Sequence, residues 1–216
     1  MKQYLLITSL TVLLVACGDK AQAPAANTAS SAAAPVATQA AAPAAAPAAA
    51  PDKEALVGQA KAAAQALGGT LKQELEAAMQ AGGPIAALGV CNTKAPEIAK
   101  AVSAEKGMAV SRVSLKPRNP TQGVPAEWQA KVLHDFEARK AAGEPADGLA
   151  YAEVVGNEFR FMKAIPTGGV CLACHGETLS PDVSAKLKEL YPNDLATGFK
   201  EGDLRGAFVV VKNLAP

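Results

Sequence analysis

Apolar residues recur every four positions in the part of the chain where the composition becomes mixed. Between residues 52 and 80 they fall on one side of a helix, which predicts a long amphipathic helix. The stripe consists of Leu67, Leu71, Leu75 and Met79. Glycine weakens helices, so the pair Gly82-Gly83 should end this helix and Gly68-Gly69 should bend or break it.

Two shorter helices are predicted after the long one. The first covers 84–91. Asn92 and Thr93 are residue types that cap helix N-termini, so a second helix should begin near Thr93 and cover about 93–106. This arrangement places Cys91 at a junction between two helices, just before the start of the second.

The second half of the chain has the patterns of one helix and several strands. The helix covers 126–141 and buries Trp128, Val132 and Phe136 on one side. Strands are predicted at 108–115, 149–155, 158–165 and 204–212. The connections between neighbouring strands are short, which favours an antiparallel sheet and an α+β fold over a doubly wound α/β fold.

The chain opens with the features of an export signal. Residues 1–16 contain one cation, Lys2, and then an apolar run that is too short to span a bilayer comfortably. The run ends in LVAC at 14–17, which resembles a bacterial lipobox, so Cys17 is predicted to carry the lipid of a periplasmic membrane-anchored lipoprotein. Gly18 follows the cysteine and favours the outer membrane. The alternative is an ordinary signal peptide with a chance cysteine.

Composition divides the rest of the chain into a tether and one domain. After Cys17, the segment to residue 51 is mostly Ala, Pro, Ser, Thr and Gln, which predicts an extended tether. Residues 52–216 are enough for a single domain. The formal net charge is +1 and no basic block interrupts the sequence, so a nucleic acid partner is not expected.

The segment GVCLACHG at 169–176 contains the strongest chemical motif. Two thiols at Cys-x-x-Cys spacing add to the vinyl groups of one haem, and the adjacent histidine reaches the iron. We therefore expect Cys171 and Cys174 to hold one covalent haem c, with His175 as an iron ligand. The competing interpretations are a structural disulfide, a thioredoxin-like redox pair, and a zinc site completed by Cys91.

Several other residues have both a functional and a structural interpretation. Arg112 and Arg118 flank a predicted strand end and are candidate contacts for haem propionates, although exposed arginines need no such role. His134 is predicted on the solvated side of its helix. Tyr191-Pro192 is interpreted as a turn, and Arg205-Gly206 as strand where glycine permits close approach. Core positions are predicted for Met79, Met108 and Met162.

Four segments occur together in a characteristic order: CNTKAPEIA, VSLKPRNPTQGVPAEWQ, GGVCLACHG and YPNDLATGFKEGDLRGAFVV. With them, the run from about 85 to 213 resembles the bacterial PAS-like c-type haem domains, which occur as exported cytochromes and as sensory ectodomains. The resemblance implies a PAS-like antiparallel sheet flanked by helices, one covalent haem, and Cys91 as an unusual distal ligand to the iron.

On the residues alone, two interpretations of Cys91 remain open: a buried inert thiol and an iron ligand. If Cys17 is acylated and Cys171 and Cys174 bind the porphyrin, Cys91 has no thiol within the chain to pair with. A helix beginning near Thr93 would favour its thiolate through the helix dipole. The resemblance to the haem domains favours ligation by Cys91.

These observations predict a lipid-anchored mono-haem c-type cytochrome in electron transfer or redox response. The alternative is a haem-based sensor of redox state or of a small gas. Because the sequence has no kinase or cyclase motif and no transmembrane helix after the signal, such a sensor would act through a signalling protein partner. An enzyme is not expected, since no acid–base residue can be nominated near the iron.

Overall fold

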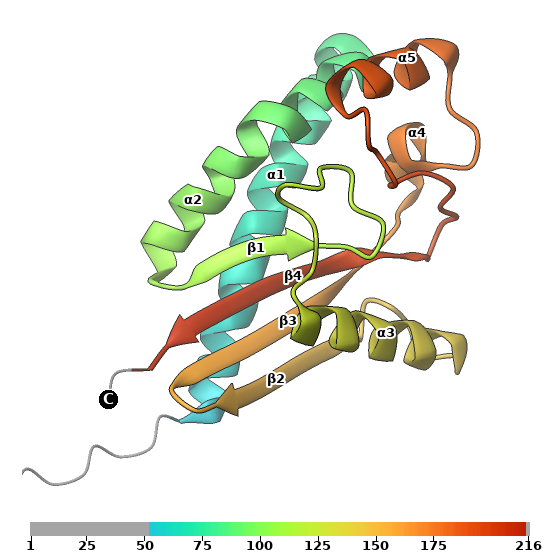
Figure 1. Ribbon diagram of the computed structural model, residues 1–216. Helices are drawn as coiled ribbons and strands as arrows, with labels where there is room; N and C mark the ends of the chain where they lie inside the picture. The colour runs from blue at the N-terminus through green and yellow to red at the C-terminus, as the bar shows by residue number, and fades with distance from the viewer. Residues whose placement is uncertain (1–51, 215–216) are drawn as a thin grey trace, which may run out of the picture. The chain divides into compact units, whose positions relative to one another are not determined.

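The computed structural model describes residues 52–214. The predicted signal peptide, Cys17 and the tether lie outside these residues. Figure 1 shows an antiparallel sheet with the long helix α1 along one face and α3 on the other. The strands are β1 (Ala109–Val113), β2 (Ala150–Val155), β3 (Glu158–Pro166) and β4 (Leu204–Asn213), in the order β1-β4-β3-β2. The predicted α+β class, the strands and the antiparallel pairing are confirmed.

Helix α1 (Lys53–Gly89) is longer than predicted. Its backbone stays helical through Gly68-Gly69, so the helix does not break at this pair. A Cβ at Gly68 would lie 2.8 Å from the ring of Phe208, which shows that this glycine allows close packing of α1 on β4. The helical geometry breaks at Gly82 and Gly83, with φ of −158° and 67°, where the end of the long helix was predicted.

The predicted helix start near Thr93 is wrong. A π-helical turn (Val90–Lys94) joins the end of α1 directly to α2 (Ala95–Lys106). The Thr93 hydroxyl donates to the carbonyl oxygen of Gly89 at 2.8 Å instead of capping a helix. Cys91 therefore lies within continuous helical backbone, and the expected helix dipole beside its thiol is absent.

Two apolar layers hold the sheet between the helices. Leu67 of α1 and Phe161 of β3 belong to the layer that includes Met108, whereas Phe136 of α3 (Glu127–Ala141) belongs to the layer that includes Met162. Phe161 and Met162 are neighbours in sequence and serve opposite faces, as the period of a strand requires. The core positions predicted for Met108 and Met162 are confirmed.

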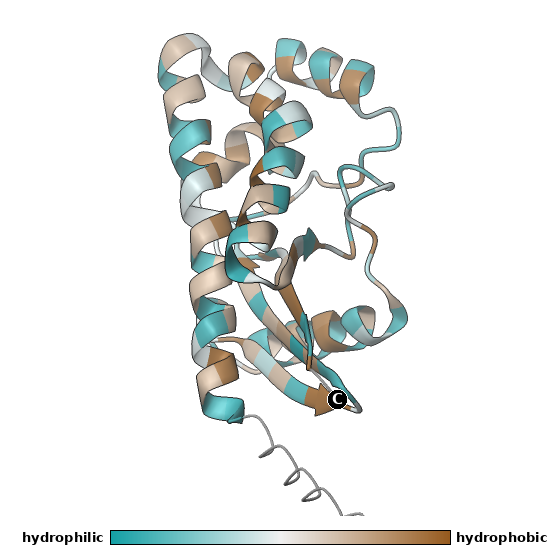
Figure 2. Ribbon diagram, turned by 90° about the vertical axis from the view of Figure 1, so that its left-hand side faces the viewer, coloured by the Kyte–Doolittle hydropathy of each residue, from teal (hydrophilic) through white to brown (hydrophobic). Residues whose placement is uncertain are grey.

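Three short helical segments between β3 and β4 were not predicted. They are η2 (Gly169–Cys171), α4 (Leu172–His175) and α5 (Pro181–Leu190). Ser180 caps α5, and its Val183 and Leu187 pack against Leu88 of α1. Figure 2 shows apolar and polar segments alternating along α1, the pattern expected of a helix with one buried face. Within residues 52–214 no helix is both long and apolar enough to cross a membrane.

Candidate functional site

A cavity of about 420 Å³ lies between the helices and the cysteine-containing turn. All the described residues that the sequence assigned to a cofactor line this cavity: Cys91, Arg112, Arg118, Cys171, Cys174 and His175. They come from the π turn, from β1 and the loop after it, and from η2 and α4. Much of the wall is apolar and is formed by Leu71, Leu75, Met79, Leu88, Ala95 and Ile165.

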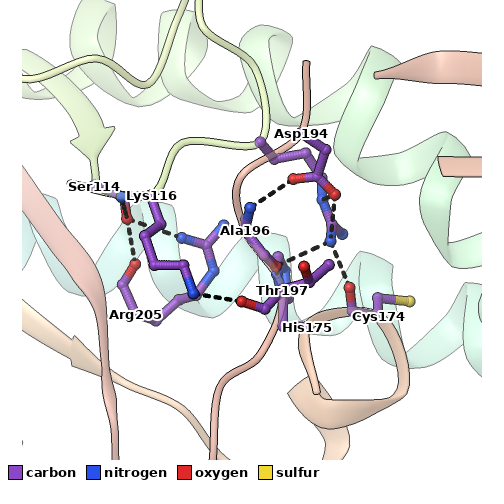
Figure 3. Close-up of polar contacts among 9 residues, drawn as sticks. Ser114, Lys116, Cys174, His175, Asp194, Ala196, Thr197 and Arg205 are labelled. Carbon is purple, nitrogen blue, oxygen red and sulfur yellow. Dashed lines mark hydrogen bonds and ion pairs between the residues drawn. The ribbon is translucent and has the colours of Figure 1, made fainter. Parts of the chain in front are cut away.

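The imidazole ring of His175 is held in place by a hydrogen bond that it donates to a backbone carbonyl. Its Nδ1–H donates to the carbonyl oxygen of Ala196 at 2.6 Å. Figure 3 labels both residues where they meet. This bond leaves Nε2 with its lone pair, the form in which a histidine binds a metal. Burial, with the positive charges of Arg205 and Arg118, lowers the His175 pKa to about 2 and keeps the ring neutral.

Arg118 is buried and makes several contacts with the protein. Its Nε donates to Asp194 Oδ2 at 3.1 Å, and its Nη2 donates to the carbonyl oxygens of Ala196, at 3.2 Å, and of Cys174. The Arg118 and Asp194 side chains are 7% and 10% exposed, so this is a buried ion pair. Nη1 of Arg118 has no partner among the described residues.

Arg205 is a cavity residue that the sequence analysis interpreted as structural. It lines the cavity, and its Nη1 donates to the Ser114 hydroxyl oxygen at 3.2 Å. Burial and the charges of Arg118 and Arg112 lower its pKa to about 10. Burial also lowers the pKa of Arg112, although this side chain is open to solvent in the cavity.

The cavity therefore combines apolar walls with positively charged side chains. Arg112, Arg118 and Arg205 line it, and no Asp or Glu is among its described lining residues. Asp194 neutralises Arg118 from behind the wall. A ligand that matches these walls has a large apolar surface and at least one anionic group.

The three described cysteines are free thiols, so the structure contains no bond between Cys171 and Cys174. Burial raises the pKa of the Cys174 thiol, against the opposing charge of Arg118. The zinc alternative also lacks a site, because no three Cys, His, Asp or Glu residues within 52–214 are placed to hold one ion. Cys91 lines the wall as a half-buried residue of the π turn.

Of the other residues discussed in the sequence, some line the cavity and one lies on the protein surface. His134 is exposed and its Nδ1 lies 3.2 Å from Glu137 Oε2, on α3 and outside the cavity lining, as predicted. Met79 was predicted to be core but is half-buried and lines the cavity. Tyr191, interpreted as part of a turn, is buried and also lines the cavity, and burial and the nearby Cys91 raise its pKa to about 12.

Gly206, near the start of β4, has the role predicted for it. A Cβ at Gly206 would lie 2.3 Å from the Val113 carbonyl oxygen, so only glycine permits this approach of β4 to β1. The close approach brings Arg205 beside Ser114, at the cavity wall. The sequence around Arg205 and Tyr191 does not indicate that they line the cavity, because their positions depend on how the segment between α5 and β4 folds back.

Comparison with known proteins gives one family and one solved structure. The crystal structure of the cyanobacterial haem protein Tll0287 matches with a TM-score of 0.55 and 24% identity, over 75% of this chain and 94% of that chain. This likeness supports the fold described above. No curated protein sequence matches the chain. The model of the Tll0287-like family matches residues 30–212, and the protein therefore belongs to the Tll0287-like family.

Proposed function

We propose that this protein binds one haem c, held covalently by Cys171 and Cys174, and works in electron transfer or redox response. The observation that carries the proposal is the opening of the Cys-x-x-Cys-His turn onto an apolar cavity lined by arginines. The related solved protein is described as a haem protein, which supports the same class of ligand here. A bound haem supplies a one-electron couple, and the residues of this chain determine its setting.

The donor set fits a haem of the c type. The two thiols and the imidazole come from adjoining short helical segments, η2 and α4, and all line the same cavity. Both thiols are unbonded, as thioether formation requires. The Nδ1–H bond of His175 to Ala196 leaves Nε2 for the iron and fixes the ring orientation.

Arg112 and Arg205 are the arginines best placed to receive haem propionates. Both line the cavity, and burial of each guanidinium lowers its pKa. Charge-assisted hydrogen bonds to carboxylates would offset the cost of this burial. Arg118 keeps Nη1 free for such a bond, while its other nitrogens serve Asp194 and backbone carbonyls.

Cys91 is proposed as the second iron ligand. It lines the cavity from the π turn, whereas His175 lines it from α4, so the two donors come from different elements around one space. A thiolate ligand stabilises ferric over ferrous iron and would give this protein a low potential. The helix dipole no longer supports the thiolate, so the support for ligation is the shared cavity and the family resemblance.

A haem-based sensor of redox state or of a small gas is the second candidate. The π-helical turn that carries Cys91 favours it, because such turns interrupt the regular helical ladder and often mark functional positions. Loss of the Cys91 bond on reduction or protonation would open one iron position to a gas. The message would then pass to a signalling partner.

Covalent attachment is the decisive test. The protein is expressed with a cytochrome c maturation system, and the purified product is extracted with acid and acetone. We expect the red colour to stay with the protein, and to become extractable or disappear when Cys171 and Cys174 are both changed to alanine. Cys91→Ala is the matched control, since it removes a cavity thiol and should leave attachment intact. Wild-type protein that is colourless, or that loses its haem to acetone, would refute the proposal.

A further inference from the structure

One carbonyl oxygen receives both the histidine and a buried arginine. The oxygen of Ala196 accepts the His175 Nδ1–H at 2.6 Å and the Arg118 Nη2–H at 3.2 Å. The Ala196 N–H donates to Asp194 Oδ1 at 2.7 Å, while Asp194 Oδ2 accepts from Arg118 Nε at 3.1 Å. Figure 3 shows Asp194, Ala196 and His175 gathered in this network.

The Ala196 carbonyl lies outside the helices and strands, so side-chain hydrogen bonds hold it in place. Residues 194–198 are in no helix or strand, so regular backbone hydrogen bonds do not fix the Ala196 carbonyl. Arg118 ties this carbonyl to that of Cys174, which precedes His175 in the chain. One Asp194 carboxylate oxygen holds Arg118 and the other accepts from the Ala196 N–H, so the N–H of Ala196 is restrained directly and its carbonyl through Arg118.

We propose that Arg118 and Asp194 are positioning residues for His175, which fix its ring plane and keep its proton on Nδ1. This role differs from the propionate contact expected for Arg118 from the sequence. It rests on the proposed function only for the use of the imidazole as an iron ligand. The buried charges are costly to hold in this place, and removing one partner would leave the other uncompensated.

Two substitutions separate this role from general packing. Asp194→Asn keeps an oxygen acceptor for the Ala196 N–H but removes the charge that holds Arg118. Arg118→Lys keeps a positive charge but cannot reach Asp194 and two carbonyls with a rigid fork of donors. Arg139→Gln is the control, because it breaks a partly exposed ion pair between Arg139 of α3 and Glu144 in the loop after it, and neither residue lines the cavity.

The test is nitrogen NMR of the two histidine rings in the full chain, expressed without haem maturation. Wild-type His175 should give the spectrum of a single Nδ1–H tautomer, with exposed His134 as an internal reference. Asp194→Asn and Arg118→Lys should each convert His175 to a tautomer mixture or an exchanging proton, while Arg139→Gln should not.

A single unchanged Nδ1–H tautomer in both Asp194→Asn and Arg118→Lys would overturn the proposal. Thermal unfolding identifies any variant that fails to fold, and the other variant then decides the question. The spectra are recorded without haem. A failure of covalent haem attachment therefore does not prevent the NMR measurement, and it gives a different result from a failure of this proposal.

Discussion

Gly206 on β4 approaches the Val113 carbonyl oxygen on β1 so closely that a Cβ in its place would lie 2.3 Å away. Its φ of 152° lies in a region that residues with side chains rarely adopt. The contact holds the two strands together where they border the cavity, next to Arg205. The position of a cavity arginine therefore depends on a backbone approach that only glycine allows.

Gly206→Ala should lower the free energy of unfolding by about 2–4 kcal/mol, because it adds both a steric clash with backbone and a strained φ. Urea unfolding followed by circular dichroism measures the change. Gly58→Ala is the matched control, since a Cβ at this exposed helical position meets nothing within 4 Å. The control should raise stability by up to about 1 kcal/mol. Equal stability of Gly206→Ala and wild type would contradict the steric explanation.

Arg205→Gln should lower the midpoint potential of the haem-loaded protein, on the order of 50 mV. A cation beside the cavity disfavours the more positive ferric iron, so its removal favours oxidation. Arg112→Gln should act in the same direction, since this residue lines the same cavity. Redox titration with optical detection gives the potentials. Arg139→Gln, on α3 and outside the cavity lining, should leave the potential unchanged, and an equal shift in that variant would refute a local effect.

The sequence predicted the fold well where the signal was local. Short segments rich in apolar residues and bounded by turns located β2, β3 and β4 to within two residues, because the signal for each strand lies within its own segment. Helix α5 was missed because its two buried residues, Val183 and Leu187, are a weak signal within a short charged segment. The cap predicted at Thr93 failed because its hydroxyl bonds back to Gly89 within the helix.

The sequence predicted the part of the candidate site that lies in one contiguous segment. The Cys-x-x-Cys-His motif is contiguous, so the sequence reveals Cys171, Cys174 and His175 directly. Asp194 and Arg205 gain their roles only when the segment between α5 and β4 packs against the loop after β1. The pattern of apolar residues within either segment gives no indication of this long-range contact.

Cys17→Ser should release the exported protein from membranes, if the lipobox interpretation is right. Cys17 lies outside the described residues, so this prediction rests on the sequence alone. Fractionation of cells, followed by detection of the protein in soluble and membrane fractions, measures the effect. Cys91→Ser is the matched control, because it also removes one thiol and should leave the protein membrane-bound. Wild-type protein that is already soluble would show that no lipid anchor is present.

Cys91→Ala should change the iron ligation of the haem-loaded protein. We expect the ferric spectrum to lose the features of a thiolate-ligated low-spin haem, and the midpoint potential to rise on the order of 100 mV. The physical reason is loss of an anionic sulfur that stabilises ferric iron. The reduced variant should also bind carbon monoxide readily, since one iron position becomes open.

A methionine or His134 could also bind the iron in place of Cys91, and of these residues within 52–214 only Met79 lines the cavity. Met108 and Met162 are buried in the two sheet cores, and His134 is exposed on α3. Met79 lines the same cavity as Cys91, so it is the methionine that could replace Cys91 at the iron. Met79→Leu keeps the apolar volume and should leave the spectrum and potential unchanged. The opposite pattern, with Cys91→Ala silent and Met79→Leu altered, would assign the iron to methionine and leave Cys91 as an inert thiol of the π turn.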